Sequence, residues 1–131
     1  MPTFDDVEQI AMALPEVTEG QRFSNRTWFV GKKGFVWERP LNKADIKRYG
    51  DETPPEGPLL AVKVEDEDDK RAVLEANPKA FFTIEHFNGY PAVLIQLKKV
   101  TKRALREAIV DAWLACAPPR LAKEYLAERH R

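Results

Sequence analysis

Lys32 and Lys33 are the residues of this chain whose type and spacing best suit chemistry. They lie side by side between two glycines, in the aromatic and β-branched segment 27–39. This pattern predicts a β-hairpin with both lysines at its tip. A protruding cationic tip suits phosphate groups, and Trp28 and Trp37 beside it would offer flat rings for base stacking. The segment therefore favours non-covalent binding of an anion, in particular a nucleic acid.

Other reactive residue types lack the partners that a reaction requires. His86 is the only candidate general base, and the sequence identifies neither a nucleophile nor an orienting group for it. Cys116 lies in an apolar helical pattern, which indicates a small core residue. The acidic run 65–69 lacks the glycine and distal glutamate of an EF-hand loop, and suits the first turn of a helix. We therefore predict no enzymatic activity, no catalytic residue, no metal site and no cofactor.

The charge of the chain is balanced overall but segregated along the sequence. There are 21 basic and 21 acidic residues. Residues 20–50 contain eight bases and two acids, and residues 96–131 contain nine bases and four acids. The acids are concentrated in 1–19 and 51–69. A fold that brings the two basic segments together would carry a positive surface that the net charge conceals.

This charge pattern leads to a predicted nucleic-acid contact surface around the hairpin. Lys102 and Arg103 would assist it, because cations in the first turn of a helix oppose the helix dipole and would suit a bound phosphate. The alternatives are that these cations are simply solvated and that the tryptophans pack in the core. The predicted contact residues are Arg22, Arg26, Trp28, Lys32, Lys33, Trp37, Arg39, Lys43, Lys47, Arg48, Lys102 and Arg103.

The elements that must position these residues predict one α+β domain over 1–131. Strands joined by hairpins, with helices toward the ends, favour an antiparallel sheet of about five strands with helices on one face and the other face open. The predicted helices cover 3–14, part of 41–50, 65–77, 102–116 and 120–129. The predicted strands are the hairpin 27–39, 59–64, 81–84 and 92–97.

Two hairpin registers are compatible with the sequence. Pairing Val30 with Phe35 would put Trp28 and Trp37 on one face, whereas a three-residue loop would put Phe29 opposite Trp37. In both registers an aromatic side chain can lie on the face that the helices leave open.

The start of the chain and its hydropathy predict a soluble, cytoplasmic protein. The N-terminus is acidic, unlike the basic start of a signal peptide, and no apolar run approaches the roughly 18 residues of a membrane-spanning helix. We therefore expect no membrane partner.

Several segments spread over the chain together resemble the MmcQ/YjbR family. They are 13–19 (ALPEVTE), 29–37 in the hairpin, 60–64 in the next strand, then Arg71, Leu74, 77–78 and 81–82, and finally 117–121. The resemblance implies a compact α+β fold similar to CyaY and frataxin, and DNA binding through a double wing. It supplies no catalytic residues, and the wing that it places is the hairpin with Lys32 and Lys33. The chain departs from the family pattern at two places. Lys102 and Arg103 stand where acidic residues are common in the family, and Pro119 stands where a basic residue is common.

The leading functional hypothesis is thus a non-enzymatic protein that binds DNA or another polyanion with weak sequence specificity, because lysine contacts phosphate as a point charge. A second hypothesis is a small-ligand or metal-binding domain, which predicts a concave pocket lined by hairpin aromatics on the open sheet face. A third is a protein-interaction module.

Overall fold

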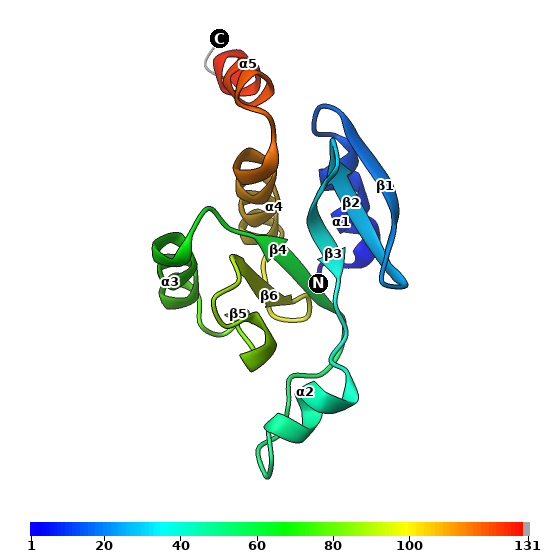
Figure 1. Ribbon diagram of the computed structural model, residues 1–131, viewed down its shortest axis with the longest axis vertical. Coiled ribbons are helices and arrows are strands. Elements are labelled where there is room, and N and C mark those ends of the chain that lie inside the picture. The colour runs from blue at the N-terminus through cyan, green and yellow to red at the C-terminus, as the bar shows by residue number, and fades with distance from the viewer. Residues whose placement is uncertain (130–131) are drawn as a thin grey trace.

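The computed structural model describes residues 1–129 and shows one sheet packed against helices (Figure 1). The sheet has six antiparallel strands in the order β1-β2-β3-β4-β6-β5. The strands are β1 (Val17–Arg22), β2 (Asn25–Val30), β3 (Lys33–Glu38), β4 (Leu59–Lys63), β5 (Phe81–Phe82) and β6 (Ala92–Gln96). The helices are α1 (Phe4–Met12), α2 (Lys43–Arg48), α3 (Glu67–Ala76), α4 (Lys102–Cys116) and α5 (Pro119–Arg129), with a short 3₁₀ turn η1 (Glu85–Phe87).

The predicted α+β class is confirmed, with six strands in place of about five. The additional strand is β1, which has the sequence VTEGQR and buries only Val17. It lies at the edge of the sheet, so it needs neither a hydrophobic run nor strict alternation. None of the helices within residues 1–129 combines the length and the hydrophobicity of a transmembrane segment.

Helix caps set two of the element boundaries. Thr3 Oγ1 accepts from the Asp6 N–H, and the Asp6 carboxylate accepts from the Thr3 N–H at 2.8 Å, which completes a capping box at α1. Thr101 Oγ1 accepts from the Ala104 N–H at 3.1 Å and starts α4 at the predicted residue. Both helices therefore begin within one residue of their predicted starts.

Helices α1 and α4 cover one face of the sheet and enclose the main core. Alternate residues of the central strands point to this face, and one row across the sheet is Trp28–Val36–Val62–Val93. Trp113 of α4 is fully buried, and its Nε1 donates to the Pro15 carbonyl at 3.1 Å. This bond ties α4 to the start of β1 and satisfies a polar atom that burial would otherwise leave unpaired.

A β-bulge at Phe35 decides the hairpin register, and neither register considered above forms. Val30 pairs with Lys33 across a two-residue turn, and Trp28 pairs with Val36, so Phe35 is the extra residue. Gly31 has φ +62°, as the first turn residue of a type II′ hairpin requires. Because the bulge shifts alternation by one residue, Trp28 points to the helix-covered face and Trp37 to the opposite one.

The opposite face carries a second, smaller core. Its row across the sheet is Thr27–Trp37–Ala61–Leu94, partly covered by η1 and the loop after it. Lys70 of α3 is buried and holds this loop, because its Nζ donates to the Phe87 carbonyl at 2.7 Å and the Tyr90 carbonyl at 2.9 Å. The rest of this face, toward β1, is not covered by a helix (Figure 1).

Candidate functional site

A cleft of about 660 Å³ lies on the sheet face that α1 and α4 leave open. It is bounded by one end of the hairpin, by the loop around η1 and by the segment that leads into α2. Although the chain has as many acids as bases, no carboxylate side chain from residues 1–129 lines the cleft. The lining residues are Arg22, Phe23, Asn25, Thr27, Gly34, Trp37, Arg39, Pro40, Leu41, Asn42, His86, Phe87 and Tyr90.

Aromatic rings form one wall of the cleft. The ring centroids of Trp37 and Tyr90 are 6.5 Å apart, edge to face, and Phe87 lies 5.7 Å from Tyr90 and 6.4 Å from Trp37. Phe87 is only 3% exposed, whereas Tyr90 is 39% exposed and Trp37 is half-buried. Phe87 therefore supports the wall from behind. Trp37 and Tyr90 are its more exposed rings, and Lys63 Nζ lies 4.4 Å from the centroid of the Tyr90 ring.

The β1–β2 turn forms the opposite lip. Arg22 pairs with Asn25, and the two turn residues Phe23 and Ser24 have φ +53° and +66°. Two consecutive positive φ angles are typical of a type I′ turn, in which glycine or asparagine is usual. A bulky residue in this backbone conformation raises the free energy of the folded state by on the order of 1–3 kcal/mol. The Phe23 side chain is nevertheless 86% exposed, with the Arg22 guanidinium 5.6 Å from its ring centroid. The lip thus places an aromatic ring and a cation in solvent.

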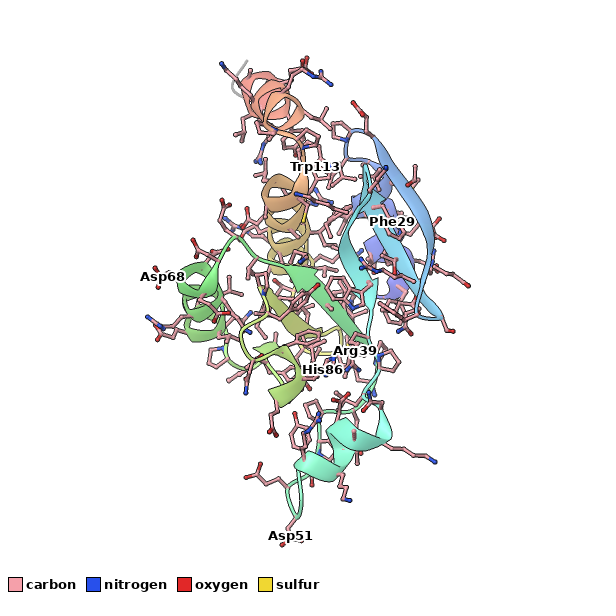
Figure 2. All side chains as sticks on the ribbon, viewed as in Figure 1. Phe29, Arg39, Asp51, Asp68, His86 and Trp113 are labelled. Atoms are coloured by element: carbon pink, nitrogen blue, oxygen red, sulfur yellow. The ribbon has the colours of Figure 1, made fainter. Side chains whose placement is uncertain are left out.

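Arg39, just after β3, and His86, in η1, both line the cleft and are labelled in Figure 2. The Arg39 side chain is 12% exposed, and its Nη2 is 2.9 Å from a carboxylate oxygen of the buried Asp45. Asp45 also completes a capping box with Asn42 at the start of α2. Because this carboxylate balances its charge, Arg39 anchors α2 more than it attracts an anion. Arg22 makes no salt bridge with any residue that the structure describes, so it is the free cation of the cleft.

The structure separates the predicted basic residues into groups. Lys32 and Lys33 are exposed at the tip of the hairpin, directly before Gly34, which lines the cleft. Lys43 and Lys47 are exposed on α2, directly after the cleft residue Asn42. All four, like Arg22, are without a salt bridge in the described part of the chain.

The other predicted cations are paired with acids. Arg26 contacts Glu8, Glu19 and Glu38, and its hydrogen bond to Glu19 raises its pKa above the ordinary arginine value. These three contacts hold the guanidinium against the hairpin, where it also lies 4.9 Å from the centroid of the Trp28 ring. Arg26 is therefore a structural cation.

Arg48 and the two predicted contact residues of α4 are paired as well. Arg48 approaches Asp45 at 3.5 Å and Glu85 at 3.7 Å. Lys102 lies 3.3 Å from Asp6, and Arg103 lies 3.5 Å from Glu107. Each of these cations therefore has a carboxylate neighbour, in contrast to the four exposed lysines above.

Helix α4 packs on β3, but the basic residues Lys102 and Arg103 at its start do not join those of 20–50 at the cleft. Lys102 and Arg103 begin a helix that packs on the covered face of the sheet, whereas the cleft lies on the other face. Trp28 is 0% exposed, so its ring is part of the core and presents no surface to a ligand. Of the predicted contact residues, the cleft brings together Arg22, Trp37 and Arg39.

Sequence reasoning missed Phe23 and Tyr90 as site residues. Phe23 stands alone in a polar segment, and the only signal was an aromatic residue with no apolar neighbour. Tyr90 occurs in the turn sequence NGYP, which indicates a loop and not what that loop faces. His86 was considered only as a base, and its position in the cleft suits a hydrogen bond to a ligand.

Comparison with known proteins gives consistent relatives. The family model described as YjbR matches residues 12–115. The uncharacterized proteins Mb2600 of Mycobacterium bovis and Rv2570 of Mycobacterium tuberculosis are each 43% identical to this chain over 130 residues, covering 97% of it and 98% of their own length. The crystal structure of Deinococcus radiodurans protein DR2400, a DUF419 domain, aligns with a TM-score of 0.66 at 21% identity and covers 95% of this chain and 88% of that one. The structural likeness to DR2400 shows that the two proteins share a fold.

Proposed function

The chain belongs to the YjbR family, and on the evidence of its open sheet face we propose that it binds nucleic acid, DNA or a similar polyanion, and catalyses no reaction. The observation that carries this proposal is the cleft without a carboxylate, lined by aromatic rings and two arginines. Aromatic surface combined with unpaired cations is the combination that attracts bases and phosphates together.

The proposed contact surface follows the open side of the hairpin to its tip, where Lys33, paired with the core residue Val30, points to the other face of the sheet. It comprises five exposed cations that form no salt bridge with a described residue: Arg22 at the cleft, Lys43 and Lys47 on α2, and Lys32 and Lys33 at the tip. Four of these five are lysines, which contact phosphate without the forked geometry that reads a base edge. We therefore expect weak sequence specificity.

The size of the electrostatic contribution can be stated in advance. Three to five phosphate contacts to a duplex predict that the logarithm of the association constant falls with the logarithm of salt concentration with a slope between about −2.7 and −4.5. A protein with no net charge but a local positive surface should show this dependence, because phosphate contacts respond to local charge.

The test is a fluorescence anisotropy titration of a labelled 20-nucleotide strand and of its duplex, from 50 to 200 mM salt. We expect R22E/K43E at the cleft and K32E/K33E at the tip each to weaken binding and to make the slope shallower by up to about 1.8 on duplex. The control is R71E/K79E, which makes the same charge change on α3 and just after it, near the opposite edge of the sheet; among the described residues, Arg71 forms a salt bridge only with the exposed Asp68, at 3.8 Å. Absence of binding to both probes at 50 mM salt would refute the proposal, as would an equal loss in the control.

The cleft also favours a second candidate function, the binding of a free small molecule. Its volume lies within the range of about 300–1,000 Å³ that is usual for such sites, and its wall is concave and aromatic, as the small-ligand hypothesis predicts. The absence of carboxylates from the lining selects a neutral or anionic ligand over a cation.

A further inference from the structure

We infer that the cleft receives one unpaired base of a single-stranded nucleic acid, with the base on the aromatic rings and its phosphate at Arg22. This inference rests on the proposed function and specifies the ligand at the same site. The site has three parts: the exposed Phe23 ring on the lip, the wall formed by Trp37 and Tyr90, and Arg22 on the lip, which has no salt-bridge partner within residues 1–129.

The Phe23 lip is the feature that packing does not explain. An apolar ring that is 86% exposed gains nothing from the core, and its backbone occupies a conformation that disfavours bulky residues. Glycine or asparagine would form the same turn with less strain. A ring held in solvent at the rim of an aromatic cleft gains surface contact only when a ligand covers it.

Stacking selects an unpaired base over a duplex. Within a duplex both faces of each base are covered by neighbouring bases, so a protein ring reaches a base face only in a single strand or after the base is flipped out. The cleft volume of about 660 Å³ suits one nucleotide, and a double helix would lie across its mouth. An unpaired base can therefore stack on these rings, whereas the bases of a duplex cannot.

The polar groups of the cleft complement this ligand. Asn25 and His86 line it and can each exchange hydrogen bonds with a base edge. Arg22 is exposed and has no carboxylate partner among the described residues, so its charge is available to a phosphate. Arg39 is already neutralised by Asp45, which leaves Arg22 as the cation that a phosphate would contact within the cleft.

The wall is held in place before a ligand arrives. Lys70 donates to the carbonyls of Phe87 and Tyr90, the two aromatic residues of the loop, from a buried position on α3. A loop fixed in this way loses little conformational entropy on binding, which favours affinity.

The test compares three probes at 50 mM salt: a labelled 12-nucleotide mixed-sequence single strand, a hairpin duplex of matched charge, and a free mononucleotide. We expect the single strand to bind at least about tenfold more tightly than the duplex. We expect F23A to weaken single-strand binding by about 5- to 150-fold, as loss of one stacked base predicts, and to leave the duplex unchanged. Phe23 is exposed, so F23A should fold; F23W should restore binding, and L126A, at another exposed apolar residue, should have no effect.

The outcomes separate the inference from the function on which it rests. Equal binding of strand and duplex, with F23A changing neither, would overturn the inference and leave nucleic-acid binding standing. Binding to none of the probes would overturn both. Binding of the mononucleotide as tightly as the strand, with the same loss in F23A, would identify a free nucleotide as the ligand and overturn the single-strand assignment.

Discussion

Trp28 and Trp37 point to opposite faces of the sheet, although they lie on neighbouring strands of one hairpin. The bulge at Phe35 produces this difference, because the extra residue reverses the alternation of β3 relative to β2. One tryptophan therefore stabilises the fold, and the other lines the cleft.

The two tryptophans should consequently respond differently to truncation. Trp28→Ala removes a fully buried ring from the main core and should lower the free energy of unfolding by about 3–5 kcal/mol. Trp37→Ala removes a half-buried ring and should cost less stability while weakening oligonucleotide binding. Urea denaturation of both variants, with binding measured on the folded Trp37 variant, checks this. A larger loss of stability for Trp37→Ala would contradict the assignment of faces.

Lys70 should control the order of the cleft loop. Lys70→Met keeps much of the aliphatic length but leaves the carbonyls of Phe87 and Tyr90 without their donor, which should cost about 1–3 kcal/mol. Amide hydrogen exchange in residues 84–92 should become faster than elsewhere. Lys79→Met makes the same change at an exposed residue and should leave exchange in the loop as it is. Unchanged exchange in Lys70→Met would show that packing alone holds the loop.

The hairpin turn should depend on glycine at position 31. Its φ of +62° is unfavourable for a residue with a Cβ, although no atom outside the adjacent residues lies within 4 Å of where that Cβ would be. Gly31→Ala should therefore destabilise the protein by roughly 1–2 kcal/mol through backbone strain alone. Thermal unfolding gives the value. Wild-type stability in this variant would mean that the turn adopts another conformation.

The Asp6 carboxyl should titrate below the ordinary aspartate range. The hydrogen bond from the Thr3 N–H is the main cause of its lowered pKa, and Lys102 lowers that pKa further. Since the folded-state pKa is lower than the unfolded one, the stabilisation is present above about pH 4 and is lost as the pH falls through the folded-state pKa. NMR titration should show the Asp6 pKa rising in Lys102→Met toward 3.8. An unchanged pKa in that variant would remove Lys102 as a contributor.

The burial of Cys116 raises the pKa of its thiol. The thiolate is the reactive form, so a thiol reagent near pH 7 should modify this residue slowly in the folded protein and rapidly after denaturation. The ratio of the two rates measures the protection. Equal rates would mean that the end of α4 opens readily.

The fold was largely predictable because most elements carry local signals. Helix α4 begins and ends at the predicted residues, 102 and 116, since Thr101 caps one end and consecutive prolines follow soon after the other. Strand β1 was missed because it contacts the core through Val17 alone, and a strand with one buried residue has no hydrophobic pattern.

The candidate site was less predictable, because it depends on register and on distant pairing. The bulge at Phe35 has no distinct sequence signal, and it alone decides which tryptophan faces the cleft. The acids that neutralise Arg26 come from three separate elements, so their contact is visible only in the folded chain. Segregation of charge along the sequence therefore overstated segregation of charge on the surface.

The most direct test of the central claim is to map oligonucleotide binding by the ¹⁵N–¹H chemical shifts of the backbone amides. A single strand should shift the amide signals of residues 22–27, 37–43 and 86–90, with smaller changes at Lys32 and Lys33. Perturbations confined to α1 and the start of α4, on the covered face of the sheet, would contradict the central claim.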